Sequence, residues 1–171
     1  MDENSHQVWS SGSPKRQSRQ DVTGEYVTML GDSFYKIHNY GSIETFFMSI
    51  VSSSDHWLFI ASNGGLSAGR VNSDQALFPY YTEDKLADNH DNTGGKTILR
   101  VSKGNEVCLW EPFTTRQYRQ YEVERNLYKN VRGTTLVFEE INHSLELSCR
   151  YAWRTSDKFG FVKTVWIRNI S

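Results

Sequence analysis

LELSCRYAW, residues 145–153, places an apolar side chain at every second position from Leu145 to Trp153. The intervening positions hold Glu, Ser, Arg and Ala. Successive side chains of a strand point to opposite faces, so this alternation predicts a β-strand with one apolar face. It is the clearest strand pattern in the chain.

Segments with the same two-residue period occupy most of the sequence from residue 24 onward, separated by turn-forming residues such as Asn142-His143. Only residues 81–89 are compatible with a helix. Many short strands with frequent turns are typical of an antiparallel β-sandwich. We therefore expect an all-β, supersandwich-like fold with one long ordered loop. The other expected strands are residues 25–30, 33–37, 45–51, 57–60, 97–101, 107–110, 121–128, 134–141 and 159–170.

The last expected strand, residues 159–170, carries apolar side chains on both faces, which predicts a strand covered on both sides. The sequence stops where this strand ends, and an open edge strand is prone to pair with other chains. We therefore expect residues 22–171 to form a sandwich that is incomplete and continues in a longer parent polypeptide. Residues 1–21, rich in Ser, Gln and Arg, are expected to be a disordered leader.

Composition and charge exclude several functions. The 171 residues carry a formal net charge of −1, which gives no electrostatic basis for binding nucleic acid or a membrane surface. No apolar run approaches the roughly 18 residues of a membrane span. The leader lacks the apolar segment of a signal peptide, which indicates a cytoplasmic protein, with a secreted or periplasmic parent left open. Cys108 and Cys149 are expected to be buried thiols.

Residues 62–95 show no convincing strand, and connections longer than about 12–15 residues are usually functional or disordered. Glycines in SNGGLSAGR, residues 62–70, let the backbone approach a ligand closely. Amide, guanidinium and carboxylate groups suit hydroxyl-rich ligands, and tyrosine rings can stack on a sugar. The alternative is an ordinary surface loop in which Arg70 pairs with Asp74 or Glu83. The predicted carbohydrate contacts are Asn63, Arg70, Asn72, Asp74, Tyr80 and Tyr81.

No pattern in the chain predicts a catalytic residue, a metal site or a cofactor. The histidines are isolated, and none has metal-ligand spacing to another His or Cys. Glycosidic chemistry would need two carboxylates across a cleft, whereas the acidic residues of 74–91 are more often solvated in such a loop. The glycine spacing also lacks the strand, helix and distant acidic residue of a dinucleotide site.

The stretches GEYVTMLGDSFYKIHNY, residues 24–40, and FFMSIVSSSDHWLFIASNGGLSAGRVNSDQALFPYY, residues 46–81, resemble the opening of bacterial carbohydrate-active proteins related to cellobiose phosphorylase. The resemblance extends over residues 22–171. It implies an N-terminal supersandwich similar to the galactose mutarotase fold. In that family a helical (α/α)6-barrel carries the general acid, and the sandwich assists assembly, often across a homodimer.

The leading hypothesis is therefore a non-catalytic, carbohydrate-associated module of a multidomain glycoside phosphorylase or hydrolase. Its expected partners are a carbohydrate, the (α/α)6-barrel domain and a second copy of the chain. Two alternatives remain. One is a mutarotase- or epimerase-like isomerase that uses a carboxylate with His38 or His56. The other is an assembly module without sugar contact.

Overall fold

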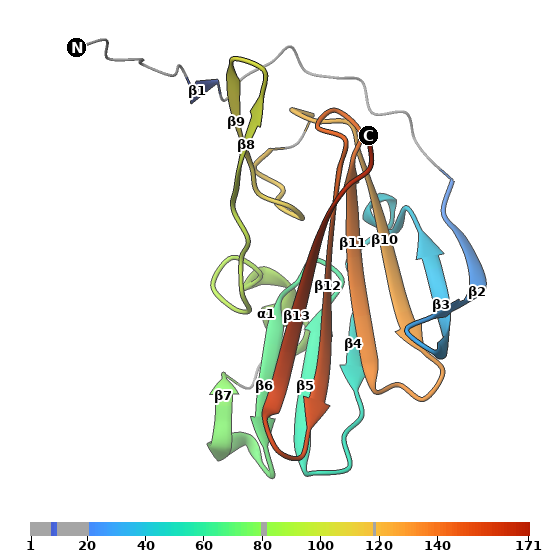
Figure 1. Ribbon diagram of the computed structural model, residues 1–171. Coiled ribbons are helices and arrows are strands. Elements are labelled where there is room, and N and C mark those ends of the chain that lie inside the picture. Colours follow the sequence, from blue (N-terminus) through green and yellow to red (C-terminus); the bar gives the residue numbers. More distant parts are fainter. Residues whose placement is uncertain (1–7, 10–20, 80–81, 118) are drawn as a thin grey trace.

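The computed structural model describes residues 8–9, 21–79, 82–117 and 119–171. These residues form three sheets, and the longest strands belong to a six-stranded antiparallel sheet (Figure 1). From one edge to the other, this sheet contains β13 (Gly160–Asn169), β12 (Leu147–Ser156), β11 (Thr135–Asn142), β10 (Val123–Asn130), β3 (Asp32–His38) and β2 (Thr23–Met29).

A four-stranded antiparallel sheet lies against the six-stranded sheet and forms the second layer of the sandwich (Figure 1). A small third sheet contains two antiparallel strands and a short parallel one. The described residues also include three short helical segments, which lie in connections. The second layer comprises β4 (Phe47–Ile50), β5 (His56–Ala61), β6 (Leu66–Arg70) and β7 (Ala76–Phe78); the third sheet comprises β1 (Val8–Trp9), β8 (Leu99–Lys103) and β9 (Glu106–Trp110); the helical segments are η1 (Tyr40–Ser42), η2 (Ser73–Gln75) and α1 (Glu83–Asp88).

The main core fills the space between the two larger sheets. Leu136, Phe138 and Trp153 of the six-stranded sheet pack with Leu58 and Ile60 of the second layer. Alternate residues of each strand supply this core, as the two-residue period requires. The apolar face of residues 145–153 divides between this cluster and a smaller one beneath the third sheet, around Trp110, Leu145 and Cys149.

The opposite face of the six-stranded sheet is partly buried as well. Phe34, Tyr128, Val137 and Ala152 form a separate apolar cluster there, with side chains of β2 packed against it. Residues from both edge strands, β2 and β13, line one groove on this face, so the sheet is curled. Curling buries the small side chain of Ala152, which the alternation alone would place in solvent.

Two adjacent carboxylates on β11 are buried on opposite faces of the sheet. Glu140 is 2% exposed and accepts hydrogen bonds from Trp110 Nε1 (2.9 Å), the Phe113 amide (2.7 Å) and Arg125 Nε (2.8 Å). Arg125 Nη2 also donates to the Thr114 carbonyl at 2.8 Å. The carboxylate therefore fastens the connection between β9 and β10 to the sheet.

Glu139, which is 3% exposed, accepts hydrogen bonds from the Tyr128 hydroxyl (2.5 Å), Asn126 Nδ2 (3.1 Å) and Arg150 Nε (2.6 Å). Burial raises the pKa of Glu139, but the Tyr128 hydrogen bond and the Arg150 charge outweigh it and hold the pKa below its ordinary value. Burial and the same hydrogen bond raise the pKa of Tyr128.

The all-β sandwich is confirmed, each expected strand overlaps an observed one, and α1 lies within the predicted helical residues 81–89. The strand predicted for residues 145–153 begins two residues later, because Leu145 and Glu146 lie in the turn before β12. The expectation that residues 62–95 lack a strand is wrong, because β6 and β7 extend the second layer there. The prediction that the last strand is covered on both sides is also wrong for its second half, since residues 165–169 are exposed. Both cysteines are free thiols; Cys149 is buried and Cys108 is half-buried. Burial raises the pKa of Cys149 to about 12.

Replacing Glu140 by glutamine is expected to lower the free energy of unfolding by about 3 kcal/mol, because it leaves Arg125 without its carboxylate. Urea denaturation at pH 7 measures this loss. Lys103→Gln, which breaks the exposed pair with Glu146, should change stability by about 0.5 kcal/mol or less. Equal effects of the two variants would contradict the role assigned to Glu140.

A lowered folded-state pKa makes the stabilising contribution of Glu139 dependent on pH. That contribution should be complete above about pH 5 and should disappear as the pH falls below the ordinary value of 4.5 toward the folded-state pKa. Wild type should therefore exceed Glu139→Gln in stability at pH 7, and the difference should shrink at pH 3. Glu106→Gln, an exposed position, should show little difference at either pH; a Glu139→Gln deficit that is constant with pH would refute the assignment.

Candidate functional site

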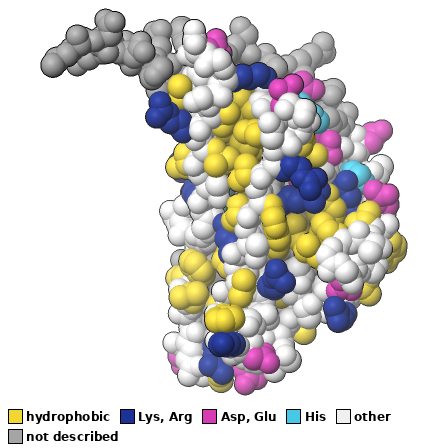
Figure 2. All heavy atoms as spheres, viewed as in Figure 1, with side chains coloured by type: hydrophobic (Ala, Val, Ile, Leu, Met, Phe, Trp, Pro, Cys, Tyr) yellow, Lys and Arg dark blue, Asp and Glu magenta, His cyan; other side chains and the backbone are white. Residues whose placement is uncertain are grey.

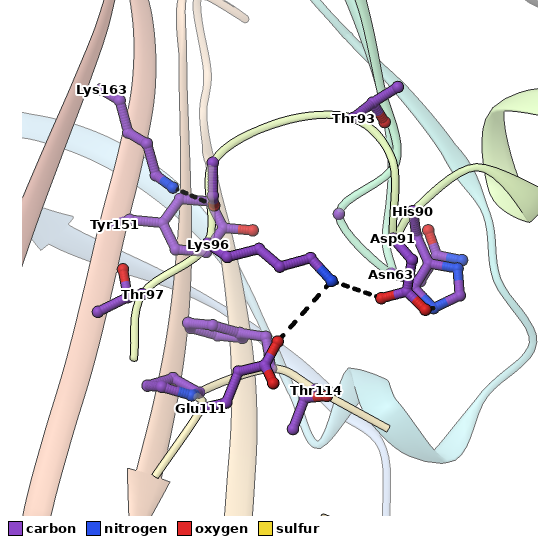
Figure 3. A pocket seen from close by; sticks show the side chains of 14 residues that line it. Asn63, His90, Asp91, Thr93, Lys96, Thr97, Glu111, Thr114, Tyr151 and Lys163 are labelled. Atoms are coloured by element: carbon purple, nitrogen blue, oxygen red, sulfur yellow. Dashed lines mark hydrogen bonds and ion pairs between the residues drawn. The ribbon is translucent and has the colours of Figure 1, made fainter. Parts of the chain in front are cut away.

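A pocket of about 60 Å³ opens where the β5–β6 turn, the segment after α1 and the β9–β10 connection meet strands β12 and β13 (Figure 3). Its walls combine lysines, carboxylates, threonines and aromatic rings from segments far apart in sequence. The volume admits a few water molecules or the edge of a larger ligand.

The tight turn between β5 and β6 forms one side of the pocket. A Cβ atom on Gly65 would lie 2.1 Å from the Leu86 carbonyl oxygen, so only glycine fits where the turn meets α1. Asn63 Nδ2 donates to the Ala87 carbonyl at 2.8 Å, and Asn63 Oδ1 accepts from the Gly65 amide at 3.2 Å. Asn63 thus fixes the turn and also lines the pocket.

Charged side chains form a second wall. Lys96 Nζ lies 2.5 Å from Asp91 Oδ1 and 3.8 Å from Glu111 Oε1, and points between the two carboxylates (Figure 3). Arg116 Nη2 lies 3.2 Å from Asp91 Oδ2. The Lys96 hydrogen bond and the neighbouring Arg116 lower the pKa of Asp91 below its ordinary value. The Lys96 side chain is 36% exposed and that of Asp91 is 39% exposed, so both also reach solvent at the pocket mouth.

Aromatic rings form the third wall. Tyr151 stacks on Phe138 with ring centroids 4.8 Å apart and contacts Phe113 edge-on at 4.9 Å. Lys163 Nζ lies 4.6 Å from the Tyr151 ring centroid and donates to the Gly95 carbonyl at 2.6 Å. Burial lowers the pKa of Lys163 and raises that of Tyr151 well above its ordinary value.

The Tyr151 hydroxyl faces the pocket, and it has no hydrogen-bond partner within the described part of the chain (Figure 3). At the pH values of ordinary solutions it remains a neutral phenol that can donate and accept. The pocket therefore offers this hydroxyl, an ammonium donor at Lys96 and carboxylate acceptors at Asp91 and Glu111. That combination suits a neutral ligand rich in hydroxyl groups.

The structure brings only one of the described residues predicted to bind sugar to this pocket. Asn63 lines it, whereas Arg70, Asn72 and Asp74 lie at or beyond the opposite end of β6. Asn72 caps η2 by accepting a hydrogen bond from the Asp74 amide at 3.1 Å. Arg70 is exposed and makes no ion pair with Asp74. The predicted contacts Tyr80 and Tyr81 lie outside the described residues, and so does the side chain of Glu83.

The histidines proposed for an isomerase do not line the pocket. His38 Nε2 lies 2.7 Å from Glu25 Oε1 on the exposed β2–β3 surface, whereas His56 lies on β5 and contacts Ser54 and Phe161. Among residues whose positions are described, no cluster of three His, Cys, Asp or Glu side chains could hold a metal ion. No described helix is long and apolar enough to cross a membrane.

Sequence reasoning missed Tyr151, Lys163 and the Asp91–Lys96 pair. Tyr151 was predicted only as a member of the apolar strand face, and its ring does pack there. The five-residue spacing of Asp91 and Lys96 gave a weak signal for an ion pair, but no pattern connects either residue with β12. The Asp91–Lys96 pair lies near Tyr151 and Lys163 only because of the path that the connections take across the sheet.

The fold defines the class of this protein as an all-β antiparallel sandwich. Comparison with known proteins finds no matching family and no matching curated protein.

The contact between Gly65 and α1 predicts a strong effect of a single methyl group. Gly65→Ala should destabilise the protein by about 1–3 kcal/mol, because the turn and α1 must separate. Gly104→Ala is the control: a Cβ there meets nothing within 4 Å, and only the φ of 62° is unfavourable, at about 1 kcal/mol. Amide chemical shifts should change around Asn63 and Leu86 in Gly65→Ala alone; unchanged shifts there would contradict the close contact.

Proposed function

We propose that this chain is a non-catalytic, carbohydrate-associated β-sandwich module, and that the pocket beside the β5–β6 turn is its sugar contact. The observation that carries the proposal is the Tyr151 hydroxyl, which has no hydrogen-bond partner among the described residues and faces the pocket beside Lys96, Asp91 and Glu111. A sugar hydroxyl both donates and accepts, and this wall supplies partners for both roles.

The size of the pocket limits how a sugar would bind. About 60 Å³ cannot enclose a sugar ring, so a sugar would place one edge in the pocket and the rest over its mouth. Weak, shallow binding fits a module that contributes one side of a site. The resemblance to proteins related to cellobiose phosphorylase supports the same role, in which an (α/α)6-barrel of a glycoside phosphorylase or hydrolase supplies the catalytic groups.

An NMR titration with glucose, cellobiose and cellotetraose tests the proposal. Saturable amide shifts should appear at residues 63–65, 91–97 and 111–114. Tyr151→Phe keeps the ring and removes one hydrogen bond, so it should weaken binding about fivefold. Arg70→Ala, at the other end of β6, should leave binding unchanged.

Three other results would overturn the proposal. Shifts centred on Arg70, Asn72 and Asp74 would assign the sugar to the opposite end of β6. The absence of saturable shifts with all three sugars would remove the sugar contact. Acceleration of glucose anomer interconversion that is lost in His38→Ala would instead support an isomerase.

A further inference from the structure

Strand β13 forms an edge of the six-stranded sheet. All ten of its residues pair with β12 in continuous register, without a bulge. On its other side, no strand from the described part of the chain pairs with it. Within those described residues, its outward backbone N–H and C=O groups have no strand partner, which is the arrangement that accepts a further strand.

The second half of β13 exposes apolar side chains on both faces of the sheet. Val165 and Ile167, 41% and 46% exposed, lie on the face that carries the main core. Trp166, 36% exposed, lies on the opposite face. Figure 2 shows hydrophobic side chains at the surface over β12 and β13, with Lys and Arg side chains between them. Water contacts both sides of the strand at once.

Trp166 lines the groove on the curled face, which has a volume of about 480 Å³. Met29 and Leu30 form its far wall, and Val137 and Ile141 contribute apolar surface. Arg150 and Arg168 bring positive charge into this apolar groove. Arg150 is held by Glu139, while Arg168 is exposed and has no ion-pair partner in the residues that the structure describes.

The usual protections of an edge strand are missing from β13. It contains no proline, and the register shows no bulge. A lysine on an edge strand can oppose pairing with another chain, but Lys163 donates to the Gly95 carbonyl and lies over the Tyr151 ring. The edge is consequently long and unbroken, and its exposed half is mostly apolar apart from Arg168, which are properties of a surface that accepts another strand.

Three kinds of occupant can be compared. A small molecule in the groove would cover Trp166 and one side of Ile167 but would leave Val165 exposed on the other face. A second copy paired through β13 would cover both faces, but β13 contains no acidic residue to meet Arg168. An added strand would pair with the edge backbone of β13, and apolar side chains on its two faces would cover Val165, Trp166 and Ile167. A carboxylate on that strand would pair with Arg168.

We propose that the β13 edge binds an extended polypeptide segment as an additional strand of the sheet. Alternate side chains of that segment pack on the two faces, and an acidic side chain on the groove face pairs with Arg168. Backbone hydrogen bonds provide affinity, and the groove and Arg168 provide selectivity. This inference is independent of the proposed sugar contact.

The probe is the capped peptide acetyl-Lys-Thr-Val-Glu-Val-Val-Thr-Lys-amide, titrated into labelled protein and followed by amide NMR. Shifts should appear at residues 160–169 and 148–154 and saturate. Two further peptides carry N-methyl groups on one or the other set of alternate residues. Only one set donates to β13, so one peptide should lose binding at least tenfold and the other should keep it.

The proposed ion pair between Arg168 and the peptide carboxylate is tested by reversing the charge on each partner in turn. Arg168→Glu should weaken binding of the glutamate peptide roughly fivefold, and a peptide with lysine in place of glutamate should restore it. Arg70→Glu makes the same charge change beside His56, near the start of β13 and at the opposite end of the strand from Arg168, and should alter the affinity for neither peptide.

The proposal is overturned by equal binding of the two N-methylated peptides, which would show that side chains alone are recognised. It is also overturned if no peptide gives saturable shifts at millimolar concentration, or if the shifts lie away from β13. Concentration-dependent dimerisation that shifts the same amides without peptide would assign the edge to a second copy.

Discussion

The buried carboxylate of Glu140 is the interaction on which the rest of the structure depends. A charge that is 2% exposed requires partners, and Glu140 finds them in the indole of Trp110, the amide of Phe113 and the guanidinium of Arg125. These groups come from β9, the following connection and β10. One side chain therefore joins the third sheet and residues 111–114 to the six-stranded sheet, and those residues supply a wall of the pocket.

The two faces of the six-stranded sheet carry different functions in this account. On one face, Glu140 places Phe113 against Tyr151, and the pocket forms at the end of the β5–β6 turn. On the other face, Glu139 fixes Arg150 at the floor of the groove beside β13. The adjacent residues of one strand thus support a polar pocket on one face of the sheet and an apolar groove on the other, and β13 contributes to both through Lys163 and Trp166.

Sequence patterns predicted the strands because half-buried strands show a two-residue period, and residues 145–153 show it most clearly. The same criterion failed for β6, whose residues Leu66-Ser67-Ala68-Gly69 are all buried and therefore show no alternation. Gly69 is required there because a Cβ would lie 2.3 Å from the Trp57 ring. The buried carboxylates were missed because a Glu-Glu pair in a strand is ordinarily expected in solvent. Of the predicted sugar contacts that the structure describes, only Asn63 reaches the pocket, since the pocket depends on long-range pairing that local patterns do not contain.

The central claim is that Glu140 holds residues 111–114 against the sheet and so builds the pocket. Hydrogen exchange of the Phe113 amide tests it most directly, because this amide lies in a connection but donates to a buried carboxylate at 2.7 Å. The account predicts that the Phe113 amide exchanges as slowly as neighbouring strand amides. Exchange as fast as in an exposed loop would show that the connection is not docked and would contradict the account.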